Sequence, residues 1–275
     1  MSAAGDRIHQ AVVAVGAVVA VMGAAWGSGA FGGTNIADAA GGALAADATL
    51  LAPDSPAFAI WSVIYVGLVL FAIVQALPSR AADPRMRAVS WWVLVSMVLN
   101  AVWIGVVQAG WLWVSVLVLA ALVAVLGVIA ARLVATPASN VLDRAVTEVT
   151  VGLYLGWSAV ATVANVTAAG RDAVKADAGD GTVWAVVVLA LVAALAAIMS
   201  IALKWRPTLA VSTGLAMAWG LAWIAVGRGS GEPHDIAVMW AAGLAATVAF
   251  AAPFAALDFR SDRRLESVDL RTDGD

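Results

Sequence analysis

The sequence predicts an all-α integral membrane protein with about eight transmembrane helices. Of its 275 residues, 63% are hydrophobic and only 12% are charged, and its mean hydropathy of +0.95 exceeds that of a soluble domain. The apolar residues form runs of roughly 20, enough to cross the roughly 30 Å hydrocarbon core as a helix. A transmembrane barrel would need segments of roughly 10 residues with alternating polarity, and the sequence contains none.

The apolar runs between polar breaks give eight helices, expected near residues 8–27, 58–77, 88–109, 111–134, 146–169, 182–203, 208–227 and 236–257. Gly110 separates the third and fourth helices by a very tight turn, so these two should be antiparallel neighbours. Pro253 falls inside the last helix and should kink it. The residues after Asp258 form a short charged tail.

The distribution of cations predicts the orientation. If the N-terminus is cytoplasmic, most cations lie inside, namely Arg7, Arg80, Arg85, Arg87, Arg132, Arg144, Lys204, Arg206, Arg260, Arg263, Arg264 and Arg271. Only Arg171, Lys175 and Arg228 are left outside. We therefore expect a multi-pass protein of the cell membrane with both termini in the cytoplasm. Cleavage of the first helix as a signal peptide is an alternative, although its apolar run is long for one.

The long loop at 28–57 then lies outside, and we expect it to be a partly mobile cover. It is rich in Gly and Ala and contains Asp38, Asp47 and Asp54 but no cation.

The spans lack the residues that several functions require. None has an ionisable residue near its middle, as ion-coupled transporters usually do; Glu148 comes closest and is interpreted as a charge at a helix terminus. His9 and His234 fall on opposite sides, which argues against a histidine metal site or a catalytic dyad. We expect no catalytic residue and no obligatory cofactor. A net charge of −3 without a basic face argues against nucleic acid as a partner.

Tryptophan is in excess, with 13 residues against 2 tyrosines and 6 phenylalanines. Seven tryptophans lie near predicted helix ends and are interpreted as interfacial anchors: Trp26, Trp91, Trp92, Trp111, Trp113, Trp184 and Trp205. The deeper ones share helix faces with polar residues. These pairs and stripes are Trp61 with Tyr65, Asn100 with Trp103, and Tyr154, Trp157, Ala161 and Asn165. Spacing alone favours the interpretation in which the amides Asn100 and Asn165 join helices while the indoles fill gaps.

At these residues the sequence resembles the TspO/MBR family of tryptophan-rich sensory proteins, related to the mitochondrial translocator protein. The resemblance covers roughly residues 8–170. It rests on three ordered blocks: the segment from Pro53 to Tyr65, Leu99-Asn-Ala-Val-Trp103, and the segment from Tyr154 to Asn165.

The resemblance implies a five-helix bundle, often dimeric, that binds porphyrins and other flat hydrophobic ligands in a pocket. Carried over by motif, the pocket residues are Trp61, Asn100, Trp157 and Ala161, with Tyr65, Trp103, Tyr154 and Asn165 as neighbours. Together with the three helices that follow, we expect three segments: a TspO/MBR-like five-helix bundle at 1–170, a three-helix membrane extension at 171–258 and a short charged cytoplasmic tail at 259–275. The expected role is sensory, regulatory or ligand-handling.

The sequence departs from the family pattern in several respects, of which two concern the loop before the second helix and the number of helices. The usual tryptophan and paired prolines before the second helix are replaced by Leu51-Ala-Pro53-Asp54-Ser-Pro56, and three further helices follow the five. Those helices contain a second pair, Trp219 and Trp223, and either form a partner surface or enlarge the bundle.

A facilitative transporter without ion coupling is the main alternative function, and a purely structural scaffold is a third.

Overall fold

The computed structural model describes residues 3–27, 36, 38–175, 177 and 181–272, with side chains described for 5–24, 36, 38–175, 177 and 181–257. All of its long elements are helices. In chain order they are α1 (Ala3–Gly27), α2 (Ile60–Ala76), α3 (Pro84–Gln108), α4 (Leu112–Ala135), α6 (Thr150–Val174), α7 (Thr182–Leu203), α8 (Pro207–Ser230) and α9 (Ile236–Thr272). Among the described residues, eight helices are long and apolar enough to cross a membrane, which confirms the predicted fold class.

Short helical pieces connect the long helices. They are η1 (Ala39–Gly42), η2 (Ser55–Ala59), η3 (Pro78–Arg80), α5 (Val141–Asp143) and the π-helical turn η4 (Arg144–Val149). Because α5, η4 and α6 are continuous, the fifth span runs from Val141 to Val174 and is longer than the predicted 146–169. Helix α9 likewise continues to Thr272, so most of the tail expected at 259–275 is an extension of the last helix.

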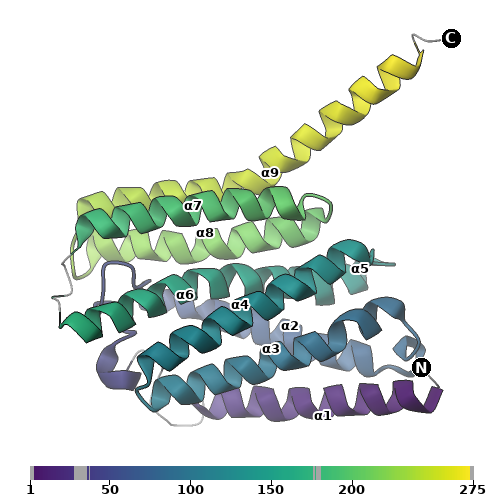
Figure 1. Ribbon diagram of the computed structural model, residues 1–275, viewed down its shortest axis with the longest axis horizontal. Coiled ribbons are helices and arrows are strands. Elements are labelled where there is room, and N and C mark those ends of the chain that lie inside the picture. Colours follow the sequence, from purple (N-terminus) through teal and green to yellow (C-terminus); the bar gives the residue numbers. More distant parts are fainter. Residues whose placement is uncertain (1–2, 28–35, 37, 176, 178–180, 273–275) are drawn as a thin grey trace.

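The predicted turn at Gly110 is present. Gly110 has a φ of +76°, a conformation that suits glycine, and α4 begins two residues later at Leu112. Helices α3 and α4 pack against each other along their length, as expected for antiparallel neighbours. In Figure 1, α9 changes direction where it leaves the bundle, and Pro253 lies within this helix. That Pro253 itself kinks the helix stays a prediction.

The helices form two packed groups (Figure 1). Helices α7, α8 and α9 form a layer on one side, and α1 lies at the opposite edge against α2 and α3. The two groups meet chiefly where α8 packs on α6. This contact is close because Gly152 and Gly156, four residues apart on α6, let the backbone of α8 approach at Leu209 and Thr213. The two segments predicted on either side of residue 170 therefore pack closely against each other. That they are separate domains stays a prediction.

The segments expected inside meet at one end of the bundle. Arg80 forms ion pairs with Asp83 and Asp143, and Arg206 donates to the carbonyl oxygens of Leu133 and Val134. The hydrogen bond to Asp83 is the main cause of a raised pKa at Arg80. The shared end agrees with the predicted parity of the loops. Which side of the membrane it faces stays a prediction.

Two charged residues differ from their predicted environments. Glu148 lies near the start of the fifth span, as predicted, but it is buried in η4 and ion-paired with buried Arg85 at 2.9 Å. The π-helical turn and the partner from α3 could not be inferred from spacing along one helix. Arg228 does not lie in an external loop but in the last turn of α8, where it is completely buried.

Candidate functional site

The predicted aromatic residues meet around Trp61 of α2. Its ring stacks on Tyr65 and Trp103 at centroid distances of 5.5 and 6.2 Å. It also makes edge contacts with Tyr154 at 5.8 Å and with Trp157 at 6.2 Å. These residues come from α2, α3 and α6, so the three stripes predicted from the sequence converge at one place.

A small, partly open and mainly apolar cavity of about 30 Å³ lies beside this cluster. Five of the eight predicted site residues line it: Trp61, Trp103, Trp157, Ala161 and Asn165. The remaining wall is made by Ala164, by Phe58 of η2 and by a loop segment that we call the cover, residues 43–57. The cover contributes Ala43, Leu44, Thr49, Ala52 and Pro53.

Asn165 holds two neighbours of the cavity in place. Its Oδ1 accepts hydrogen bonds from Trp103 Nε1 at 3.2 Å and from Ser115 Oγ at 3.1 Å. Its Nδ2 donates to the carbonyl oxygen of Ala161 at 2.9 Å. This amide therefore joins α3, α4 and α6, as the helix-joining interpretation predicted, and lines the cavity as well.

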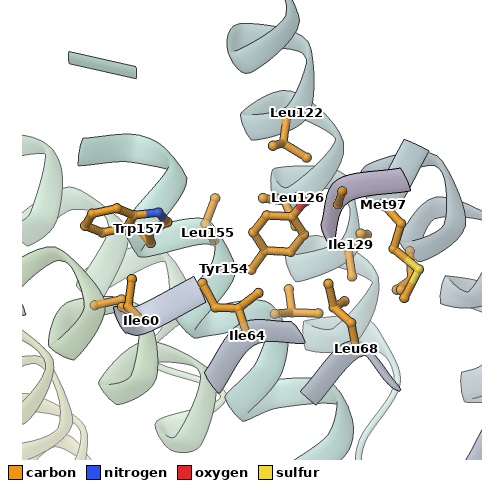
Figure 2. Packing of buried hydrophobic residues seen from close by; sticks show 14 of the residues in the cluster. Ile60, Ile64, Leu68, Met97, Leu122, Leu126, Ile129, Tyr154, Leu155 and Trp157 are labelled. Carbon is orange, nitrogen blue, oxygen red and sulfur yellow. The ribbon is translucent and has the colours of Figure 1, made fainter. Parts of the chain in front are cut away.

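The other three predicted residues lie behind the cavity wall. Asn100 Nδ2 donates to the Tyr65 hydroxyl at 2.9 Å, and Tyr154 donates its hydroxyl to the Ser96 carbonyl oxygen at 3.1 Å. Figure 2 shows Tyr154 lying toward Leu126 while Trp157 lies beside Ile60. Tyr65, Asn100 and Tyr154 support the ring of Trp61 in this conformation and do not border the cavity.

Two buried polar groups at the cavity have no protein partner among the described residues. They are Trp157 Nε1 and Thr49 Oγ1, which come from opposite walls. A buried N–H or hydroxyl without a partner costs free energy, on the order of 1–3 kcal/mol. No group of three metal-ligating side chains occurs in the part of the chain that the structure describes.

The sequence did not show how closely the cover packs against the helices. We expected an external, partly mobile cover; in the structure Leu50, Leu51 and Ala52 are buried, and Asp54 caps η2 by accepting from Ser55 N at 2.7 Å. Leu50 and Leu51 pack into the apolar core of α7–α9. A pair of leucines in a Gly- and Ala-rich loop was the signal that could have indicated this packing. Ser28, in the same predicted loop, lies outside the described residues.

The exposed tryptophans are consistent with the predicted anchors. Trp111, Trp113, Trp184 and Trp205 are each more than half exposed, as expected for rings that face lipid or headgroups. Trp91 is less exposed and stacks on His9, and Trp92 lies beneath the guanidinium of Arg132. The side chain of Trp26 lies outside the described residues.

Comparison with known proteins gives one match. No curated protein and no solved structure matches the chain. The model of the family described as TSPO-like protein matches residues 9–255, from the first turns of α1 to the membrane-spanning part of α9. The match includes α7–α9, so the last three helices belong to the region that this family model describes. The chain therefore belongs to the TSPO-like protein family.

Proposed function

We propose that the protein binds a flat hydrophobic molecule, such as a porphyrin or another tetrapyrrole, and serves a sensory or ligand-handling role in its membrane. The observation that carries this proposal is the position of Trp61, Trp103 and Trp157 on one cavity wall. Indole faces stack well on planar macrocycles, and Ala161 leaves space beside them. Membership in the TSPO-like family supports a membrane protein of this kind.

The polar groups of the wall suit such a ligand. The unpaired N–H of Trp157 can donate to an acceptor atom of the ligand, and the Thr49 hydroxyl can donate or accept. A planar molecule with one or more polar substituents would satisfy both groups. An aliphatic chain would leave them unpaired.

The cavity must enlarge to admit a tetrapyrrole. Its volume of about 30 Å³ has room for only a few water molecules, whereas ligand pockets usually measure about 300–1,000 Å³. The helices that form one wall are held by the buried contacts of Trp61, Asn165 and Tyr154. The cover is the remaining wall, so binding requires displacement of the cover.

Titration of the purified protein with protoporphyrin, followed by quenching of tryptophan fluorescence, tests this proposal. Ala161→Phe places a ring in the cavity and should weaken binding strongly. Ala120→Phe, at an exposed position of α4, is the matched control and should bind like the native protein. Saturable binding that Ala161→Phe abolishes supports the proposal. No saturable binding, or equal binding by both variants, would refute it.

A further inference from the structure

The cover is attached to α8 by a row of hydrogen bonds. Arg228 donates to the carbonyl oxygens of Thr49 at 3.0 Å and Ala46 at 2.7 Å. The backbone N–H of Asp54 donates to the carbonyl oxygen of Trp223 at 3.2 Å, and Trp219 Nε1 donates to the carbonyl oxygen of Ala57 at 2.9 Å. These bonds occur at both ends of the cover and near its middle.

The donors and acceptors lie on one face of α8. Trp219, Trp223 and Gly227 are four residues apart, and Arg228 follows directly. Gly227 lies against Asp54, whose Cβ is 3.6 Å from the position of a Cβ at residue 227. The contact therefore extends along more than two turns of α8.

Arg228 is the most unusual member of this row. It is completely buried, yet its hydrogen-bond partners are backbone carbonyl oxygens: Ala46, Thr49 and its own neighbour Glu232. The charged groups around it are Asp54, Asp47, Asp235 and Glu232, of which the first two belong to the cover. A buried guanidinium is costly unless its donors are satisfied, so the folded cover and Arg228 stabilise each other.

The cover thus has two different faces. One lines the cavity through Thr49, Ala52 and Pro53, and the other packs on the last three helices through Leu50 and Leu51. The attachments described above belong to α8. This helix is in the α7–α9 layer, whereas the aromatic wall is formed by α2, α3 and α6.

We propose that α8 acts as a clamp that keeps the cover closed, with Arg228 as its main positioning residue. Opening the cover breaks the bonds to Ala46 and Thr49 and exposes the guanidinium to water. Arg228 thereby limits how often the cavity opens, and α7–α9 control access to a site that the other helices form. The consequence for ligand exchange rests on the proposed function, but the opening of the cover does not.

A cysteine probe measures this opening without a ligand. The chain contains no cysteine, so Ala52→Cys introduces a single thiol at a buried position of the cover that borders the cavity. Its rate of reaction with a water-soluble maleimide in detergent reports opening. With Arg228→Gln added, labelling should become about ten- to hundred-fold faster, the factor expected from losing the hydrogen bonds of one charged group.

Arg206→Gln is the matched control. Arg206 also donates to three backbone carbonyl oxygens, those of Leu133, Val134 and Trp205, but at the opposite end of α8 and away from the cover. Labelling of the thiol introduced by Ala52→Cys should remain slow when Arg206→Gln is added. If Arg228→Gln does not fold, Trp219→Phe removes the bond to Ala57 while keeping a ring, and should accelerate labelling to a smaller extent.

Porphyrin dissociation rates separate the two proposals. Faster labelling of the introduced thiol in the clamp variants supports the clamp even if protoporphyrin does not bind, in which case only the proposed function fails. If protoporphyrin binds, its dissociation should accelerate in Arg228→Gln and not in Arg206→Gln. Equal labelling rates in folded Arg228→Gln, Trp219→Phe and Arg206→Gln would overturn the clamp, whatever the ligand does.

Discussion

The guanidinium of Arg85 donates to the carboxylate of Glu148 at 2.9 Å, and both side chains are only 4% exposed. The pair joins the start of α3 to the π-helical turn before α6. It thereby fixes one end of α3 and α6, which contribute Trp103 and Trp157 to the aromatic wall.

Removing one partner of this pair should destabilise the protein. Glu148→Leu leaves Arg85 buried without its carboxylate, which costs about 3–5 kcal/mol at comparable sites. The double variant Arg85→Met/Glu148→Leu removes both charges and should recover much of the loss. Thermal unfolding in detergent measures both. Asp172→Leu, which breaks the exposed pair with Lys175, should change little. Equal effects of Glu148→Leu and Asp172→Leu would contradict the prediction.

The indole rings of the cavity should contribute to porphyrin affinity. Trp61→Phe and Trp157→Phe should each weaken binding about 5- to 150-fold, corresponding to about 1–3 kcal/mol. Trp113 is 56% exposed on α4, so Trp113→Phe should bind normally. Fluorescence titration and thermal stability of the three variants check this. Equal affinities with intact folding would leave these tryptophans as packing residues.

The close approach of α8 to α6 should depend on Gly152 and Gly156, two glycines of α6. A Cβ at Gly152 would overlap the Ser212 hydroxyl, and one at Gly156 would overlap the carbonyl oxygen of Thr213. Gly152→Ala and Gly156→Ala should therefore lower thermal stability. Gly127→Ala on α4 meets nothing within 4 Å and should be neutral or stabilise by up to about 1 kcal/mol. A Gly156→Ala variant as stable as Gly127→Ala would show that the interface adjusts easily.

Asp235 should make stability depend on acid pH. Burial alone raises the pKa of Asp235, but hydrogen bonds from Thr182 Oγ1 and from the Val238 and Ala237 N–H groups lower it below the usual 3.8. A lowered pKa means that the ionised form stabilises the fold above about pH 4, and that this contribution disappears as pH falls through the lowered pKa.

Asp235→Ala tests this dependence. The Asp235 carboxylate caps α9 by accepting from the N–H of Val238. Its loss should lower the free energy of unfolding by about 0.5–2 kcal/mol at pH 7. The difference in melting temperature between the native protein and the variant should shrink toward pH 3. A difference that does not change with pH would assign the effect to packing instead of ionisation.

The orientation can be tested at two exposed positions. His234 follows α8, and Val141, 76% exposed, begins α5 at the opposite end of the bundle. With the termini in the cytoplasm, His234→Cys should react with an impermeant thiol reagent added to intact cells, and Val141→Cys should react only after permeabilisation. The reverse labelling pattern would show that the two termini lie outside the cell.

The sequence by itself determined the eight spans, because each must satisfy its backbone within an apolar helix of bilayer length. It also determined which faces of α2, α3 and α6 are aromatic, since residues three and four apart share a helix face. Trp61, Trp103 and Trp157 could therefore be chosen without coordinates. The order along the chain of the three sequence blocks that contain these tryptophans indicated the family as well.

Tertiary structure decided what those faces meet. Spacing along one helix cannot show that Asn100 faces the Tyr65 hydroxyl behind the wall while Asn165 borders the cavity, because both amides satisfy the same local pattern. Nor can it show that Arg228, which resembles any cation at a helix end, is buried against carbonyl oxygens 179 and 182 residues earlier in the chain. The contacts of Arg228 depend on where α8 lies relative to the cover and to α6, and Gly152 and Gly156 permit the close approach of α8 to α6.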